Sequence, residues 1–203
     1  MPVSAESFVA GLVLAAGGSR RLGEPKQLLP YGSGTMLDHT LGTARAAGFD
    51  QLIVALGGSS EEVRARVDLS DAEVVENSDY SEGCSSSIAA GLDAVDPRAE
   101  VLILMLGDQP GVTAATIRAL IDGRGDGTAL AVCRYDDGRG HPLAFGRSLF
   151  GELHALHGDK AVWKLLDRYG DEVVEVRVPG PVPPDVDTRE DYEAILAATG
   201  ASS

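Results

Sequence analysis

The sequence LAAGGSRRLGEPK occupies residues 14–26 and directly follows an apolar run, residues 8–14, that is typical of a buried strand. Small residues at a strand end let backbone N–H groups approach phosphate oxygens closely. The side chains of Arg21 and Lys26 can then neutralise the charge that those groups leave. The stretch therefore predicts a triphosphate-binding loop. The alternative is a glycine-rich turn whose arginine and lysine side chains are merely solvated.

Two common phosphate loops do not fit this stretch. Gly18 and Gly23 have the spacing of P-loop glycines, but Glu24 follows where that motif requires lysine. Ser19 stands where the dinucleotide-binding fingerprint has its second glycine, and the next expected strand, residues 52–56, ends in two glycines without an acidic residue for a ribose. The sequence therefore argues against a P-loop ATPase and against an NAD-dependent enzyme.

Length and composition predict one globular domain over residues 1–203. The chain is 44% hydrophobic and 24% charged, as in ordinary globular proteins, and its apolar runs are far shorter than the roughly 20 residues of a membrane helix. Residues 1–7 lack the pattern of a signal peptide, so we expect a cytoplasmic protein. Cys84 and Cys133 form neither a disulfide framework nor a zinc pattern.

The net charge of −14 argues against partners that need a basic surface, namely nucleic acids and anionic membranes. It also makes the loop distinctive, because Arg20, Arg21 and Lys26 form a local basic cluster in an acidic chain.

Beyond the loop, strand and helix patterns alternate. The run at residues 101–106 has no polar interruption, as expected of a central strand covered on both faces. The alternation predicts an α/β fold: a single Rossmann-like three-layer sandwich with a mostly parallel sheet and ligands at the carboxyl ends of its strands. Expected strands lie at residues 51–56, 72–76, 129–133 and 172–178, with an extended stretch at 141–145. Expected helices lie at 36–47, from 59 or 60, and at 85–94, 114–121, 148–156, 159–169 and from 188.

Two acidic sites stand out by position. Asp108 follows the strand at residues 101–106 directly, where a carboxylate is costly unless it holds a cation such as the Mg²⁺ of a nucleoside triphosphate. Asp185 and Asp187 alternate around one valine and would face the same way in an extended segment. The alternative for the second site is that Asp187 or Thr188 caps the last helix.

The loop resembles the L-A-A-G-x-S-x-R-x-G-x-x-K signature of nucleotidyltransferases, with Arg21 and Lys26 in the charged positions. The resemblance implies that Asp108, in Gly-Asp-Gln-Pro, is the metal-binding aspartate. It implies that Asp187 supplies a second ligand from a late D-x-D-T-P-E-D motif, in which Arg189 here replaces the proline.

The resemblance narrows to the molybdenum cofactor cytidylyltransferases, because three further segments, residues 77–83 with Ser87, 140–142 and 158–160, follow in the order seen in that family. It implies a Mg²⁺-dependent transfer of CMP from CTP to the phosphate of molybdopterin, with release of pyrophosphate. Ala16 resembles the cytidylyl form of the loop rather than the guanylyl form. A molybdoenzyme or its insertion chaperone is a possible partner. Other readings are another phosphorylated acceptor (a sugar phosphate or isoprenoid precursor), the use of GTP, or a non-catalytic cofactor carrier.

The same resemblance implies the site residues. The catalytic residues would be Lys26, Arg21 and Asp108, the metal ligands Asp108 and Asp187, and the acceptor-binding residues Gly140 and His141. The nucleotide-binding residues would be Leu14, Ala15, Ala16, Gly17, Gly18, Ser19, Arg21, Lys26, Asn77 and Ser87. For Ser87 the alternative is a helix start, and for His141 it is a structural role.

Overall fold

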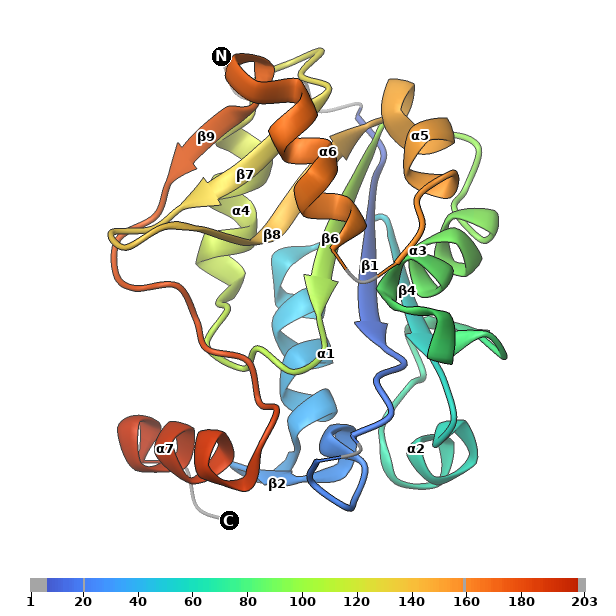
Figure 1. Ribbon diagram of the computed structural model, residues 1–203, viewed down its shortest axis with the longest axis vertical. Helices are drawn as coiled ribbons and strands as arrows, with labels where there is room; N and C mark the ends of the chain where they lie inside the picture. The colour runs from blue at the N-terminus through green and yellow to red at the C-terminus, as the bar shows by residue number, and fades with distance from the viewer. Residues whose placement is uncertain (1–6, 20, 159, 201–203) are drawn as a thin grey trace.

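A computed structural model describes residues 7–19, 21–158 and 160–200. Seven strands form one sheet in the order β5-β4-β1-β6-β8-β7-β9 (Figure 1). β8 runs antiparallel to its neighbours β6 and β7, and the other paired strands are parallel. The mostly parallel α/β fold is confirmed. The strands are β1 (Val9–Ala15), β4 (Gln51–Leu56), β5 (Glu73–Glu76), β6 (Val101–Leu106), β7 (Leu130–Arg134), β8 (Arg139–Gly146) and β9 (Val174–Arg177).

Helices cover both faces of the sheet. α1 (Met36–Ala47) and α4 (Ala114–Gly123) lie on one face, while α3 (Cys84–Asp93), α5 (Phe150–His154) and α6 (Ala161–Tyr169) lie on the other (Figure 1). The expected helix at 148–156 is shorter in the structure, because its first turn is a 3-10 turn (Arg147–Leu149). α2 (Ser60–Arg66) follows β4, and α7 (Arg189–Thr199) closes the described chain.

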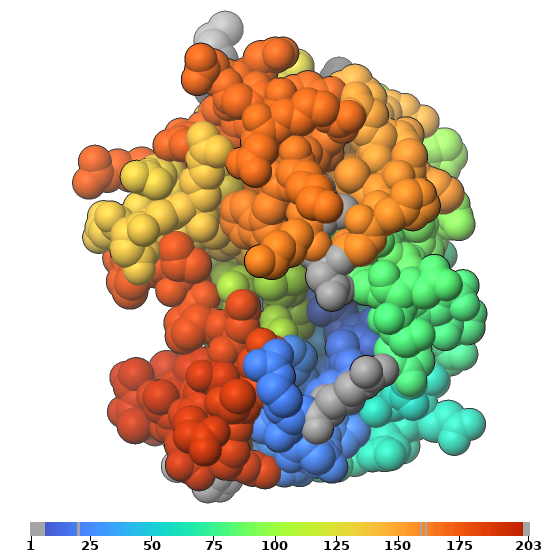
Figure 2. All heavy atoms as spheres, viewed as in Figure 1, coloured from blue at the N-terminus to red at the C-terminus, as the bar shows by residue number. Residues whose placement is uncertain are grey.

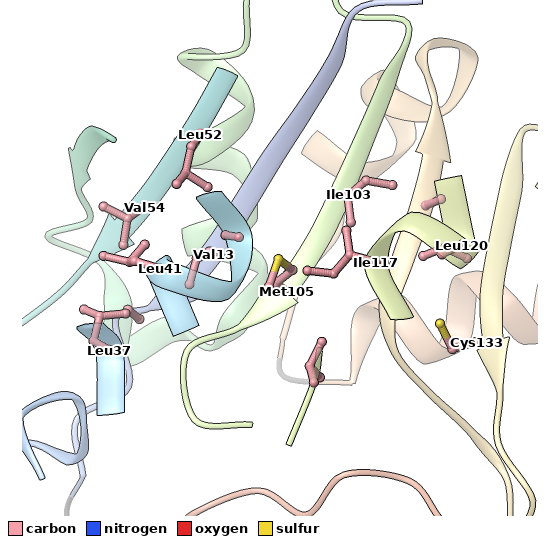
Figure 3. Packing of buried hydrophobic residues seen from close by; sticks show 14 of the residues in the cluster. Val13, Leu37, Leu41, Leu52, Val54, Ile103, Met105, Ile117, Leu120 and Cys133 are labelled. Atoms are coloured by element: carbon pink, nitrogen blue, oxygen red, sulfur yellow. The ribbon is translucent and has the colours of Figure 1, made fainter. Parts of the chain in front are cut away.

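Alternate residues of the central strand β1 enter two separate cores. Leu12 lies opposite Ile53 and Leu104 of the flanking strands and packs beneath α3, α5 and α6. Its neighbour Val13 lies opposite Val54 and Met105 and packs beneath α1 and α4 (Figure 3). Such two-sided burial explains why the strands read as continuous apolar runs.

A third, smaller cluster holds the C-terminal segment against the chain that follows the loop. Val186 and Ile195 pack with Leu29, Tyr31 and Met36, near the short hairpin of β2 (Pro30–Tyr31) and β3 (Gly34–Thr35). The hydroxyl of Tyr192 in α7 also donates to the carbonyl of Pro30 at 2.5 Å. The segment around Val186 and helix α7 is thereby held against residues 29–36.

Within the described residues, no helix is both long and apolar enough to cross a membrane.

Two helix glycines should respond oppositely to alanine. A Cβ on Gly91 of α3 would lie 2.5 Å from Cδ1 of the fully buried Leu12, whereas a Cβ on Gly42 of α1 would meet no atom within 4 Å. We expect Gly91→Ala to lower the free energy of unfolding by about 1–3 kcal/mol through overpacking. We expect Gly42→Ala to raise it by roughly 1 kcal/mol, because alanine has the higher helix propensity. Urea denaturation measures both, and changes of the same sign would contradict the packing described for α3.

Candidate functional site

A cleft opens where the carboxyl ends of β1 and β6 meet the start of α3. Its inner part is a pocket of about 270 Å³ and its outer part a pocket of about 450 Å³, and both are lined by Gly17, Gly18, Lys26, Tyr80 and Gly83. Figure 2 shows the molecule hollowed where the N-terminal, C-terminal and α3 segments approach one another. The inner pocket is also lined by Leu14, Ala15, Ala16, Gln27, Cys84, Ser87, Leu106, Gly107 and Asp108, and the outer one by Ser19, Arg21, Ser81 and Asp187.

The loop after β1 presents unused backbone donors. Ser19 has a left-handed backbone with φ of 46°, and its hydroxyl accepts the Lys26 N–H at 2.8 Å, which closes the loop. Its carbonyl accepts the N–H groups of Leu22 and Gly23 at 3.0 and 3.2 Å. In the described part of the chain, the N–H groups of Gly17, Gly18 and Ser19 have no hydrogen-bond acceptor. These groups can therefore donate to an anion.

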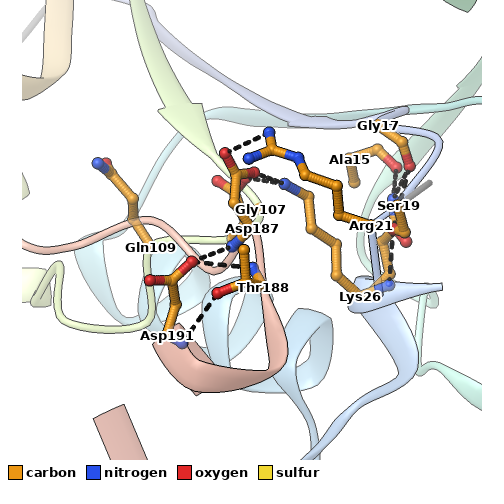
Figure 4. Close-up of polar contacts among 12 residues, drawn as sticks. Ala15, Gly17, Ser19, Arg21, Lys26, Gly107, Gln109, Asp187, Thr188 and Asp191 are labelled. Carbon is orange, nitrogen blue, oxygen red and sulfur yellow. Dashed lines mark hydrogen bonds and ion pairs between the residues drawn. The ribbon is translucent and has the colours of Figure 1, made fainter. Parts of the chain in front are cut away.

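Four charged side chains meet at the mouth of the loop (Figure 4). The Lys26 ammonium is hydrogen-bonded to the Asp108 carboxylate and lies 3.1 Å from Oδ1 of Asp187. Arg21 donates to the other oxygen of Asp187 at 3.0 Å. The Lys26 and Asp108 side chains are only 13% and 17% exposed, whereas those of Asp187 and Arg21 are 44% and 69% exposed. The inner pair is consequently shielded from solvent, and the outer pair is open to it.

Burial and charge oppose each other at this cluster. Burial by itself lowers the pKa of Lys26, but the charge and hydrogen bond of Asp108, followed by those of Asp187, outweigh it, so the pKa is raised and the ammonium form is retained. Partial desolvation raises the pKa of the Asp185 carboxyl, and the negative charge of Asp108 raises it further, while the hydrogen bond from the Gln109 side chain acts in the opposite direction.

The backbone explains how Asp187 reaches the loop. Val186 is fully buried in the third cluster, and its N–H donates to the carbonyl of Asp108 at 3.0 Å. Thr188 caps α7 in a capping box with Asp191. Because the cap is made by Thr188, the carboxylate of Asp187 is left for Lys26 and Arg21. The two interpretations of this segment therefore hold together: Thr188 caps the helix, and Asp187 contacts the cations of the loop.

Arg189, which replaces the proline of the late motif, forms an ion pair with the loop. The guanidinium of Arg189 pairs with the carboxylate of Glu24 in the loop and lies 5.6 Å from the ring centre of Tyr192. This contact ties the start of α7 to the loop a second time. Arg20 and Asp159, which also fell within the sequence motifs, lie outside the described residues.

Asn77 does not line the cleft but forms a hydrogen bond with Ser87, which does. Its side-chain amide donates to the hydroxyls of Ser86 and Ser87 at 2.8 and 2.9 Å, and its carbonyl oxygen accepts the N–H of Asp79 at 2.9 Å. Ser87 lines the inner pocket near the first turn of α3, whereas Asn77 lines neither part of the cleft. The other residues predicted to bind nucleotide and metal all line it.

Gly140 and His141 do not line the cleft. The His141 ring is 8% exposed and makes an edge-on contact with Trp163 at 5.6 Å, and its backbone carbonyl accepts the Tyr135 hydroxyl at 2.7 Å. A Cβ on Gly140 would lie 2.9 Å from Val182, so a side chain there would collide with the segment that leads to Asp185. Their assignment to an acceptor stays a prediction.

Gln27 and Tyr80 are lining residues that the sequence analysis missed. Gln27 is 3% exposed and donates its side-chain amide to the carbonyls of Ala15 and Gly17. The sequence offered a signal for Gln27, because an uncharged polar residue directly before two leucines can be buried and then needs hydrogen-bond partners. Tyr80 lies within the segment at residues 77–83 that the family resemblance singled out, but only the structure shows that it lines the cleft, from the turn between β5 and α3.

A metal would have to be held by carboxylates from separate segments. Among the described residues, no group of three or more His, Cys, Asp or Glu side chains is placed to hold an ion. Asp108 and Asp187 nevertheless converge on one cationic atom, Nζ of Lys26. Two carboxylates that share a cation fit the ligand preference of Mg²⁺, which takes one or two carboxylates and completes its shell with phosphate oxygens and water.

The chain is similar to known proteins over most of its length. The crystal structure of Rv0371c from Mycobacterium tuberculosis H37Rv in complex with manganese is 49% identical, with a TM-score of 0.85, and the match covers 95% of this chain and 100% of that one. Nicotine blue oxidoreductase of Paenarthrobacter nicotinovorans is 33% identical over 70% of this chain and 72% of its own length. Molybdenum cofactor cytidylyltransferase of Escherichia coli K12 is 31% identical over 68% of this chain and 69% of its own.

The profile of the MobA-like NTP transferase domain matches residues 11–173, which span the loop, β6 and Asp108 and end before the segment that carries Asp187. The chain therefore belongs to the MobA-like NTP transferase domain family and is a nucleotidyltransferase.

Proposed function

We propose that this enzyme transfers CMP from CTP, bound with Mg²⁺, to the phosphate of a molybdopterin-type acceptor and releases pyrophosphate. The observation that carries the proposal is the convergence of Lys26, Arg21 and two carboxylates on a loop with three free N–H donors. Ala16 in the loop and the relative named molybdenum cofactor cytidylyltransferase support the choice of nucleotide and acceptor.

In this proposal the loop binds the triphosphate. The N–H groups of Gly17, Gly18 and Ser19 would donate to phosphate oxygens, and the base would lie in the inner pocket against Ser87. Asn77 would act indirectly, because its amide fixes the Ser87 hydroxyl. Lys26 and Arg21 would neutralise the phosphates at the mouth of the loop.

Asp108 and Asp187 would hold the metal. When bound, Mg²⁺ supplies Lewis-acid polarisation of the phosphate oxygens that it contacts. The similar protein crystallised with manganese supports a divalent cation of this size class.

The reaction needs no covalent enzyme intermediate. An oxygen of the acceptor phosphate forms a bond to the α-phosphorus of CTP while the bond from that phosphorus to the bridging oxygen breaks, and the electron pair leaves with pyrophosphate. The protein orients the two phosphates and stabilises the charge that develops on the leaving group, which is the work of Lys26, Arg21 and the loop N–H groups. In the structure, the side chains of Lys26 and Arg21 form ion pairs with Asp108 and Asp187.

Pyrophosphate release tests the proposal. The enzyme would be incubated with Mg²⁺ and each of CTP, GTP, ATP and UTP, with and without molybdenum-loaded molybdopterin. Release that requires both CTP and the pterin is expected. Release with GTP would keep the transferase and discard the base assignment. CTP binding without release would point to another acceptor, such as a sugar phosphate, or to a cofactor carrier. A cytoplasmic location and delivery to a molybdoenzyme or its chaperone stay predictions from the sequence.

Removing either member of the buried ion pair should impair turnover more than folding. We expect Lys26→Ala and Asp108→Ala each to lower kcat about 10²-fold or more, roughly 3 kcal/mol of lost charge stabilisation. Two variants on the exposed face of α6 serve as controls: Lys164→Ala removes one positive charge, as Lys26→Ala does, and Asp167→Ala removes one negative charge, as Asp108→Ala does. Near-normal turnover in Asp108→Ala would refute the metal assignment.

The ion pairs also predict a competition between Lys26 and the metal. In Lys26→Met the largely buried carboxylate of Asp108 loses its cation, so we expect Mn²⁺ to bind the nucleotide-free enzyme roughly tenfold more tightly or better, a gain of about 1.4 kcal/mol. Titration followed by electron paramagnetic resonance measures free Mn²⁺. Arg21→Met removes one of the two cations at the more exposed Asp187, which keeps its contact with Lys26, so it should change the affinity less. Unchanged Mn²⁺ affinity in Lys26→Met would show that these carboxylates do not hold the metal.

The burial of His141 predicts a pH dependence of stability. Burial lowers its pKa from 6.5 to about 4, so the unfolded chain binds the proton more readily than the folded one. The stability that the neutral ring supports is complete above pH 6.5 and is lost as the pH falls towards 4, by about 3 kcal/mol over that window. In urea denaturation between pH 7 and 4, His141→Phe should lose less stability than the wild type. The exposed His157→Gln should behave like the wild type, and parallel curves for all three proteins would exclude His141 as the titrating group.

A further inference from the structure

We propose that Gln27 is a positioning residue that holds the phosphate loop in its anion-binding form. This inference rests on the proposed nucleotide site and adds a residue that acts through the loop backbone rather than on the substrate.

The Gln27 side chain connects two backbone carbonyls of the loop. It follows Lys26 at the start of the 3-10 turn Lys26–Leu28 and is 97% buried. Its amide nitrogen lies 2.5 Å from the carbonyl oxygen of Ala15 and 3.1 Å from that of Gly17. Figure 4 shows Ala15 and Gly17 side by side in the loop, each with a dashed line to a hydrogen-bond partner. One amide therefore fixes the orientation of two peptide units.

The orientation of a carbonyl determines that of the next donor. A planar trans peptide directs the C=O of one residue and the N–H of the next to opposite sides. Anchoring the Gly17 carbonyl on Gln27 therefore turns the N–H of Gly18 away from Gln27, and anchoring Ala15 does the same for the N–H of Ala16. The glycines at 17 and 18 could adopt many other conformations, because they lack a Cβ. The two hydrogen bonds select one of them before the nucleotide arrives.

Packing alone does not account for an amide at this position. The side-chain oxygen of Gln27 is buried and has no hydrogen-bond partner among the described residues. A methionine would fill a similar space without burying that unpartnered oxygen, which is unfavourable in a protein interior. What distinguishes glutamine here is its pair of N–H donors, and both point at the loop.

Three variants separate positioning from stability. Gln27→Met keeps the unbranched shape and removes both donors, and Gln27→Glu replaces them with oxygens that repel the two carbonyls. Gln51→Met is the matched control, because the Gln51 amide also donates two hydrogen bonds, at 2.8 Å to Glu73 and 2.9 Å to the carbonyl of Ala94, far from the cleft.

The experiment combines CTP affinity by calorimetry, without acceptor, with thermal unfolding and the ¹⁵N amide signals of Gly17 and Gly18. We expect both Gln27 variants to raise the Kd for CTP roughly tenfold or more and to shift the two glycine signals. Gln27→Met, which buries no new charge, should lower Tm no more than Gln51→Met does. Gln51→Met should leave Kd and the glycine signals unchanged.

Other results would overturn the inference. A Kd within twofold of the wild type in both Gln27 variants, or unchanged glycine signals, would show that the loop does not depend on Gln27. An equal rise in Kd for Gln51→Met would show that the weaker binding of CTP comes from general destabilisation of the fold and not from the loop. If the wild type bound none of the four nucleoside triphosphates, the proposed function would fail, and the positioning role with it.

Discussion

The structure of the site depends on one ammonium group held between two carboxylates. Lys26 lies in the loop after β1, Asp108 directly after β6, and Asp187 near the start of α7, so this single cation joins three segments far apart in the chain. Lys26 and Asp108 are largely buried, and a buried charge is stable only when it is paired, so the loop and the end of β6 must pack in a way that brings these two side chains together. The fold satisfies this condition by ending two adjacent parallel strands at the same edge of the sheet.

The same ion pairs bring opposite charges together at the mouth of the loop. Asp108 and Asp187 both contact Lys26, and Asp187 also contacts Arg21. In the proposed reaction, the two carboxylates would hold Mg²⁺, and Lys26 and Arg21 would contact phosphates. Each side chain would then exchange an ion pair within the protein for one with the magnesium nucleotide.

The two large cores and the small third cluster have different tasks. The large cores build the rigid sheet edge, since alternate residues of β1 are buried on its two faces. The third cluster fixes the C-terminal segment through Val186 and α7, outside the residues that match the family profile. It places Asp187 beside the loop, and the Arg189 to Glu24 pair adds a second tie. The proposed second metal ligand thus comes from a segment that packs outside the two large cores.

The sequence by itself determined the mostly parallel α/β fold and the position of Asp108 at the sheet edge, and it predicted that the loop binds an anion, because these follow from local patterns: apolar runs, a carboxylate directly after a buried strand, and small residues at a strand end. Only the tertiary structure decided which charges meet, that Asn77 supports Ser87 from behind, that His141 is buried against Trp163, and that Gln27 binds the loop. These contacts join residues whose separation in the sequence carries no periodic signal. They exist because the packed sheet and helices bring the segments together, and side-chain hydrogen bonds act only over such short distances.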